Sequence, residues 1–152
     1  MNRTNLSTHF SISEFTISQE AARRGLDNTP NAFQIASMIR LCEDILEPLR
    51  EKLGPILISS GFRSLPVNRF VGGVDNSTHT KGCAADIHVP GMRAIDLFEH
   101  IRQSGLPYSA VILEFSSWVH VAIPERTSDK PKREAWIYTR GRAGITNKEQ
   151  VS

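Results

Sequence analysis

Apolar side chains recur at steps of three and four residues through the second quarter of the chain, at Ile35, Ile39, Cys42, Leu46, Leu49 and Leu53. This period predicts one apolar face of a long α-helix. Thr29 can cap the start of this helix, and Pro30 fits its first turn, where no backbone N–H is needed. Pro48 should kink or divide the helix, and Gly54 with Pro55 should end it.

Shorter patterns predict the remaining elements. Ser11 and Glu14 have the spacing of a capping box and open a helical region that ends near Gly25. A second apolar stripe predicts a helix over residues 92–103. Apolar runs predict a buried strand over 55–60 and further strands over 84–89, 109–115, 118–123 and 135–139, whereas Gly, Asn and Ser predict a loop over 61–82. Helices followed by a mostly antiparallel sheet define an α+β fold.

Length and composition indicate one folded domain. The 152 residues, 39% of them hydrophobic, suffice for a single core, and we expect the domain to span residues 1–140, with a polar, flexible tail over 141–152. A net charge of +2 is too weak for a dedicated nucleic-acid binder. No apolar run approaches the roughly 20 residues of a membrane span. Cys42 and Cys83 are expected to be buried free thiols.

Three residues of the second half of the chain are candidate metal ligands. His79 lies near the end of the glycine-rich loop, Asp86 in the next strand, and His120 on a later strand. Two imidazoles and one carboxylate are usual ligands of a catalytic zinc. An aspartate inside an apolar strand needs a cation or several hydrogen-bond donors. From spacing alone, each histidine can instead be a surface residue or a hydrogen-bonded core residue.

Strand alternation adds a candidate base. If residues 109–123 form a hairpin, Glu114, Trp118 and His120 share a face of the sheet. A carboxylate near a metal held by His120 is what a general base requires. The alternative is a surface glutamate paired with a nearby arginine.

Four motifs of this sequence resemble those of a known family. Residues 77–86 fit the pattern S-x-H-x-x-G-x-A-x-D, residues 59–64 resemble S-G-[FY]-R-S, residues 68–73 resemble N-x-x-V-G-G, and residues 118–120 resemble W-x-H. All four are motifs of the zinc D-alanyl-D-alanine carboxypeptidase family. The segments around Glu14 and Asn28 are similar to its phage endolysin-like branch.

This resemblance implies a hedgehog/DD-peptidase-like fold and one Zn²⁺ per chain, bound by His79, Asp86 and His120. It implies hydrolysis of peptide bonds in peptidoglycan stem peptides or cross-links. We therefore expect a monomeric phage lysis enzyme. The first fifteen residues lack the apolar stretch of a secretory signal, so we expect the enzyme to wait in the host cytoplasm until it is released to the cell wall.

The resemblance also implies roles in substrate binding. Arg63 would bind a substrate carboxylate or the developing oxyanion, for which a planar fork of N–H donors is suited; a surface ion pair is the alternative. Ser77 would anchor the loop or the substrate, and Trp118 would contact the substrate.

The sequence departs from the family pattern at one position. Many members have an acidic residue three positions before the last histidine ligand, where this chain has Ser117. Some relatives, including phage-type members and hedgehog domains, resemble this chain in having a glutamate further upstream, which makes Glu114 the candidate catalytic base. The alternatives are a non-catalytic zinc-containing module that binds the wall or builds the virion, and a dipeptidase of free D-Ala-D-Ala. The sequence does not distinguish carboxypeptidase from endopeptidase action.

Overall fold

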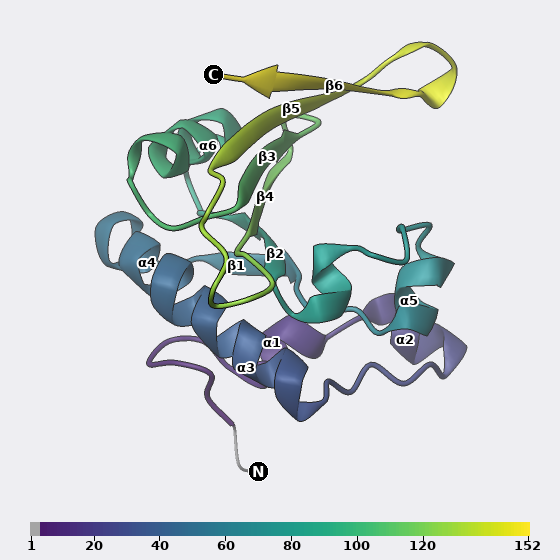
Figure 1. Cartoon of the computed structure of the whole chain (residues 1–152). Coiled ribbons are helices and arrows are strands. Elements are labelled where there is room, and N and C mark those ends of the chain that lie inside the picture. The colour runs from purple at the N-terminus through teal and green to yellow at the C-terminus, as the bar shows by residue number, and fades with distance from the viewer. Residues whose placement is uncertain (1–3) are drawn as a thin grey trace.

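The computed structural model describes residues 4–152 and begins with helices that lie against a sheet (Figure 1). The first elements are α1 (Ile12–Thr16), α2 (Gln19–Arg24) and α3 (Ala32–Leu41). A π-helical segment (Cys42–Leu46) joins α3 to α4 (Glu47–Leu53). Helix α5 (Leu65–Phe70) follows strand β1, and α6 (Ala94–Gln103) packs against β3 and β4.

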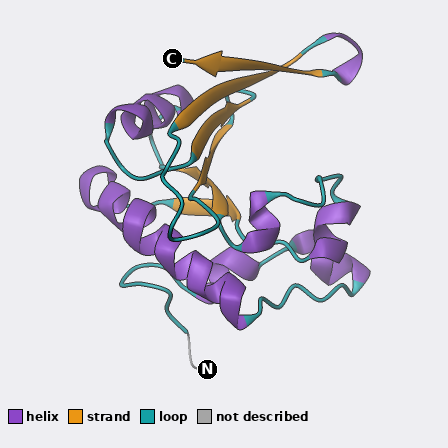
Figure 2. Ribbon diagram, viewed as in Figure 1, coloured by secondary structure: helices purple, strands orange, loops and turns teal. Residues whose placement is uncertain are grey.

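Six strands form one sheet with the order β1-β2-β4-β3-β5-β6 (Figure 2). The strands are β1 (Leu57–Ser60), β2 (Ala84–His88), β3 (Ala110–Glu114), β4 (Trp118–Ala122), β5 (Glu134–Arg140) and β6 (Thr146–Val151). Only β3 and β5 pair in parallel; the other neighbours are antiparallel. The predicted α+β class with a mostly antiparallel sheet is confirmed.

Strand alternation divides the sheet into a core face and a polar face. Ile87, Val111, Val119 and Val121 are fully buried and pack in the core with the helices. Their neighbours along each strand point to the opposite face. That second face therefore carries Asp86, His120 and the other polar residues of β2, β3 and β4.

The long helix begins and bends differently from the prediction. Asn31, not Thr29, is the N-cap: its side chain accepts from Gln34 N–H at 2.9 Å, and the Gln34 side chain accepts from Asn31 N–H at 2.8 Å. The predicted disturbance at Pro48 is a π-helical turn just before it, in which Glu47 N–H donates to the carbonyl of Cys42, five residues back. Because proline cannot donate to the carbonyl four residues earlier, the chain widens there.

Three other segments differ from their predictions. Residues 61–82 are not all loop, because they contain α5, capped by Ser64, and the 3₁₀ turn Thr78–Lys81. Strand β1 is not buried: it is the edge of the sheet, and Leu57 is 48% exposed. In place of a polar tail without regular structure, residues 146–151 form β6, antiparallel to β5.

The two cysteines and the helices agree with the composition. Cys42 and Cys83 are buried and free, as predicted. Burial raises the pKa of the Cys42 thiol to about 12, so this thiol stays protonated. Among residues 4–152, no helix combines the length and the apolar character that a membrane crossing requires.

Candidate metal centre

The fold brings the three predicted ligands together on the polar face of the sheet. His79 comes from the 3₁₀ turn, Asp86 from β2 and His120 from β4, and Asp86 and His120 are directly paired across the two strands. One potential ligand atom from each residue lies within 4.8 Å of the other two. All three residues are at most 9% exposed.

His79 is oriented by the backbone of the preceding strand. Its Nδ1 lies 2.7 Å from the carbonyl oxygen of Gly61, and donation to that carbonyl leaves Nε2 as the free lone pair. Nε2 is buried, faces Asp86 Oδ1 at 3.3 Å, and has no hydrogen-bond partner within the described chain. Burial lowers the pKa of His79, which favours the neutral imidazole that metals bind.

Asp86 is the anionic centre of the cluster. Its Oδ1 also lies 3.0 Å from Nδ1 of His120. Burial alone would raise the pKa of Asp86, but the contacts with His120 and His79 outweigh burial and lower this pKa well below its ordinary value. The carboxylate is therefore ionised and available as a ligand.

The loop that carries His79 is shaped by local hydrogen bonds and glycines. Ser77 Oγ accepts from His79 N–H at 3.3 Å and caps the 3₁₀ turn. Gly82 ends the turn with φ +74°, and a Cβ there would lie 2.5 Å from the carbonyl oxygen of Gln34. Only glycine combines this conformation with so close an approach. The backbone conformation and the close approach thus explain why the S-x-H-x-x-G motif has a glycine at this position.

Glu114 lies beside the cluster on the same face, as the alternation predicted. It pairs with Trp118, two rungs of the sheet away from the pair Ile112–His120. Burial, followed by the nearby charge of Asp86, raises the pKa of Glu114. Ser117 lies in the exposed turn, and its hydroxyl donates to the carbonyl of Phe115 at 3.0 Å. Glu114 is therefore the acid that this hairpin presents to the cluster, and the Trp118 ring packs edge-to-face on Phe115.

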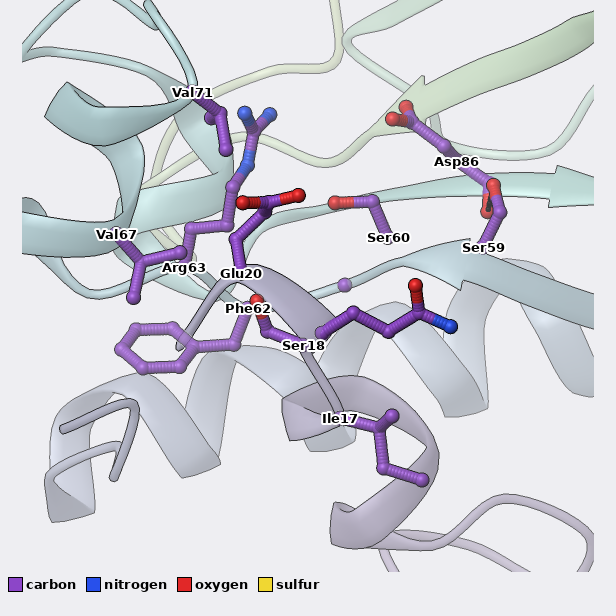
Figure 3. A pocket seen from close by; sticks show the side chains of 12 residues that line it. Ile17, Ser18, Glu20, Ser59, Ser60, Phe62, Arg63, Val67, Val71 and Asp86 are labelled. Carbon is purple, nitrogen blue, oxygen red and sulfur yellow. Dashed lines mark hydrogen bonds between the residues drawn. The ribbon is translucent and has the colours of Figure 1, made fainter. Parts of the chain in front are cut away.

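Arg63 lines a cavity of about 490 Å³ that also reaches Asp86 (Figure 3). Its Nε is buried and has no hydrogen-bond partner among residues 4–152. Burial lowers the pKa of Arg63, against the opposing attraction of Asp86 and Glu114. No ion pair of Arg63 exists within the described residues.

Three other polar residues near the centre were not among the site residues predicted from the sequence. Thr78 Oγ1 lies 3.5 Å from Nε2 of His120. Asn28 joins the N-terminal helices to the Arg63 segment. Glu20 lines the same cavity as Arg63. Thr78 occupies a variable position of its motif, and the other two lie far from the motifs in sequence, so spacing could not single them out.

Two imidazole nitrogens and one carboxylate oxygen, with a buried His79 Nε2 that lacks a partner, fit a single divalent metal with an open coordination position. Such a centre with an adjacent glutamate is typical of metal-dependent hydrolases. The family model described as peptidase M15 matches residues 8–122. The chain therefore belongs to the peptidase M15 family, whose members are zinc-dependent metallopeptidases. A comparison with curated proteins finds no match.

Proposed function

We propose that the protein hydrolyses peptide bonds of peptidoglycan stem peptides or cross-links, as a monomeric phage lysis enzyme with one zinc ion per chain. The observation that carries this proposal is the position of Glu114, half-buried on the same sheet face as Asp86 and His120. The wall substrate and the phage role rest on the resemblance of the motifs.

His79, Asp86 and His120 would hold the metal. A zinc ion held there would polarise the scissile carbonyl and would lower the pKa of a bound water to about 7. The contact between His79 Nδ1 and Gly61 fixes the ring so that Nε2 faces the site. Such a partner of a ligating histidine sets its tautomer and orientation.

Glu114 would act as the general base and then as the general acid. It would accept a proton from the attacking water and donate it to the nitrogen of the leaving group. Its raised pKa suits this role, because a carboxylate with a pKa nearer to neutrality is a stronger proton acceptor. The residue therefore supplies the acid–base function that Ser117 lacks.

Arg63 would bind an anionic group of the substrate. It is half-buried and lines the cavity, and its buried Nε has no hydrogen-bond partner among the described residues. A carboxylate or a developing oxyanion would complete its hydrogen bonds, and the bidentate geometry would orient the peptide.

The test is to incubate the zinc-loaded protein with intact peptidoglycan and, separately, with free D-Ala-D-Ala. Newly released amines are then measured in both reactions. We expect release from the wall polymer and little from the dipeptide. Release from the dipeptide alone would identify a dipeptidase instead.

A non-catalytic zinc module is the second candidate, and the serine at position 117 favours it. In that case the three cluster residues would retain zinc, while Glu114 and Arg63 would have no chemical task. Full zinc occupancy without release of amines from any wall substrate would support this alternative and contradict the peptidase.

A further inference from the structure

The cavity beside the metal cluster carries two opposite charges on different walls. Arg63 and Ser60 lie on the wall formed by the end of β1 and the segment after it, and Glu20 lies on α2 (Figure 3). The Glu20 side chain extends from α2 into the cavity in this view. Apolar side chains close the end that lies away from Asp86, namely Phe62, Val67 and Val71.

Neither charge is neutralised by a close partner. Arg63 has no ion pair within the described chain, and its Nε is buried without a hydrogen bond. The only ion pair of Glu20 among the described residues is with Arg23 at 3.9 Å, and the Arg23 side chain is 71% exposed. A pair this long and this exposed contributes little. The Glu20 carboxylate can therefore bind a cation in the cavity.

The two walls are held in a fixed relation. Asn28 Nδ2 donates to the carbonyl of Thr16 at 2.9 Å and to that of Phe62 at 3.2 Å, and its Oδ1 accepts from Ser64 N–H at 2.7 Å. The Arg24 guanidinium stacks 4.3 Å above the Phe70 ring and joins α2 to α5. The spacing of Glu20 and Arg63 is thus built into the fold.

Both charges lie on one side of the metal cluster. Asp86 is the only cluster residue that lines this cavity, whereas His120 lines a separate cavity bounded by β3, β5 and β6. A substrate whose scissile bond lies at the cluster would enter the charged cavity with only one of its two halves. That half must carry both an anion and a cation to satisfy Arg63 and Glu20 together.

We propose that this cavity is a subsite for a substrate residue with a free carboxylate and a free side-chain ammonium, bound by Arg63 and Glu20 respectively. The proposal rests on the proposed peptidase function and deepens it. A diamino residue of a stem peptide has this chemistry. Free D-Ala-D-Ala does not, because its ammonium and carboxylate lie on opposite sides of the scissile bond.

The kinetic test uses two stem peptides that differ only in the diamino residue, whose side-chain amine is free in one and acetylated in the other. For the zinc-loaded protein, we expect acetylation to lower kcat/KM by about tenfold or more, the worth of a charge-assisted hydrogen bond. For Glu20→Gln, the free-amine peptide should lose the same factor, and acetylation should then have little further effect. Glu51→Gln, an exposed glutamate of α4, is the matched control and should behave like the parent.

A binding test does not depend on turnover. Nα-acetyl-lysine carries a carboxylate and a side-chain ammonium, and Nα,Nε-diacetyl-lysine carries the carboxylate alone. Both are titrated, in the L and D forms, into the zinc-loaded protein and into Glu20→Gln, and NMR shifts are followed. We expect tighter binding of the mono-acetyl compound by the parent only, with unchanged zinc content in both proteins.

The outcomes separate this subsite from the proposed function. If neither peptide is cleaved but the parent still prefers the mono-acetyl compound, the peptidase fails and the subsite stands. If the parent cleaves both peptides at equal rates, or if Glu20→Gln keeps the parent's preference for the free amine, the assignment of Glu20 is overturned.

Discussion

The two ends of the sheet differ in burial and in the residues they carry, although one row of paired residues runs from one to the other. Register places Asp86, His120, Ile112 and Trp136 side by side across β2, β4, β3 and β5. At the ligand end the three cluster residues are buried, the His79 ring contacts the backbone of Gly61, and His120 contacts Asp86. The other end is the hairpin of β5 and β6, which lies entirely beyond the residues matched by the family model and is largely exposed. The matched residues thus include all three ligands and none of the hairpin.

The hairpin is stabilised by contacts between exposed side chains. Lys148 lies 5.0 Å from the Tyr138 ring, and Arg140 stacks 4.5 Å from the Phe115 ring at the hairpin turn of β3 and β4. Such contacts contribute about 0.5–1 kcal/mol each at exposed sites. Charged residues on β6, the other edge strand, also discourage pairing with further chains. The hairpin therefore extends the sheet without taking part in the cluster.

The largest expected effect is on zinc affinity, measured for two variants in the same row of paired residues. One variant lies at the ligand end of the sheet and the other in the β5–β6 hairpin. We expect His120→Ala to weaken zinc binding by about a thousandfold or more, because one of three ligands is lost and Asp86 keeps an uncompensated buried charge. Trp136→Ala should leave the affinity unchanged. Competition with a chromophoric chelator measures both. Full zinc occupancy in His120→Ala would refute the assignment of the ligands.

The next effect concerns catalysis without loss of metal. Glu114→Gln should lower turnover on peptidoglycan by about 10²–10⁴, the usual contribution of a positioned acid–base group, while the zinc content stays at the parent level. Glu149→Gln, the same change at an exposed glutamate of β6, is the control and should retain turnover. Ser117→Ala should also be nearly silent, since its hydroxyl bonds only the turn. A Glu114→Gln protein as fast as the parent would remove this residue from the mechanism.

A smaller effect is expected at the arginine of the cavity. Arg63→Lys retains the charge but loses the planar fork, so kcat/KM should fall by about tenfold to a hundredfold with zinc content unchanged. Arg140→Lys, on the exposed hairpin, provides the matched comparison and should have no effect in the same assay. Equal rates for Arg63→Lys and the parent would show that substrate binding does not depend on the planar set of N–H donors of Arg63.

The difference between the two ends of the sheet also explains which elements and site residues could be predicted from the sequence. The ligands lie in fixed motifs because a metal imposes residue types and spacing, and the face shared by Glu114 and His120 follows from the period of a strand.

The N-cap at Asn31 and helix α5 were missed because several cap residues compete in each segment, although Ser64 and Pro66 are a start signal for α5. Strand β6 is polar and mostly exposed, so no hydrophobic period marks it. Glu20 reaches the cavity through tertiary packing of α2 on α5, which local pattern does not encode.

The smallest expected effect is the local response of the backbone to removal of the metal. Without a cation, the buried lone pair of His79 and the charge of Asp86 lose a stabilising partner, so chelation should lower Tm by several degrees. A core of this size does not depend on the metal to fold, and we expect the apo protein to remain folded. Hydrogen exchange, compared before and after chelation, should accelerate in residues 78–88 and 118–122, which carry the ligands. Residues 134–151 should exchange at unchanged rates, because the hairpin contacts no ligand directly. Equal acceleration in both regions would mean that the metal stabilises the sheet as one unit, and the division between its two ends would be lost.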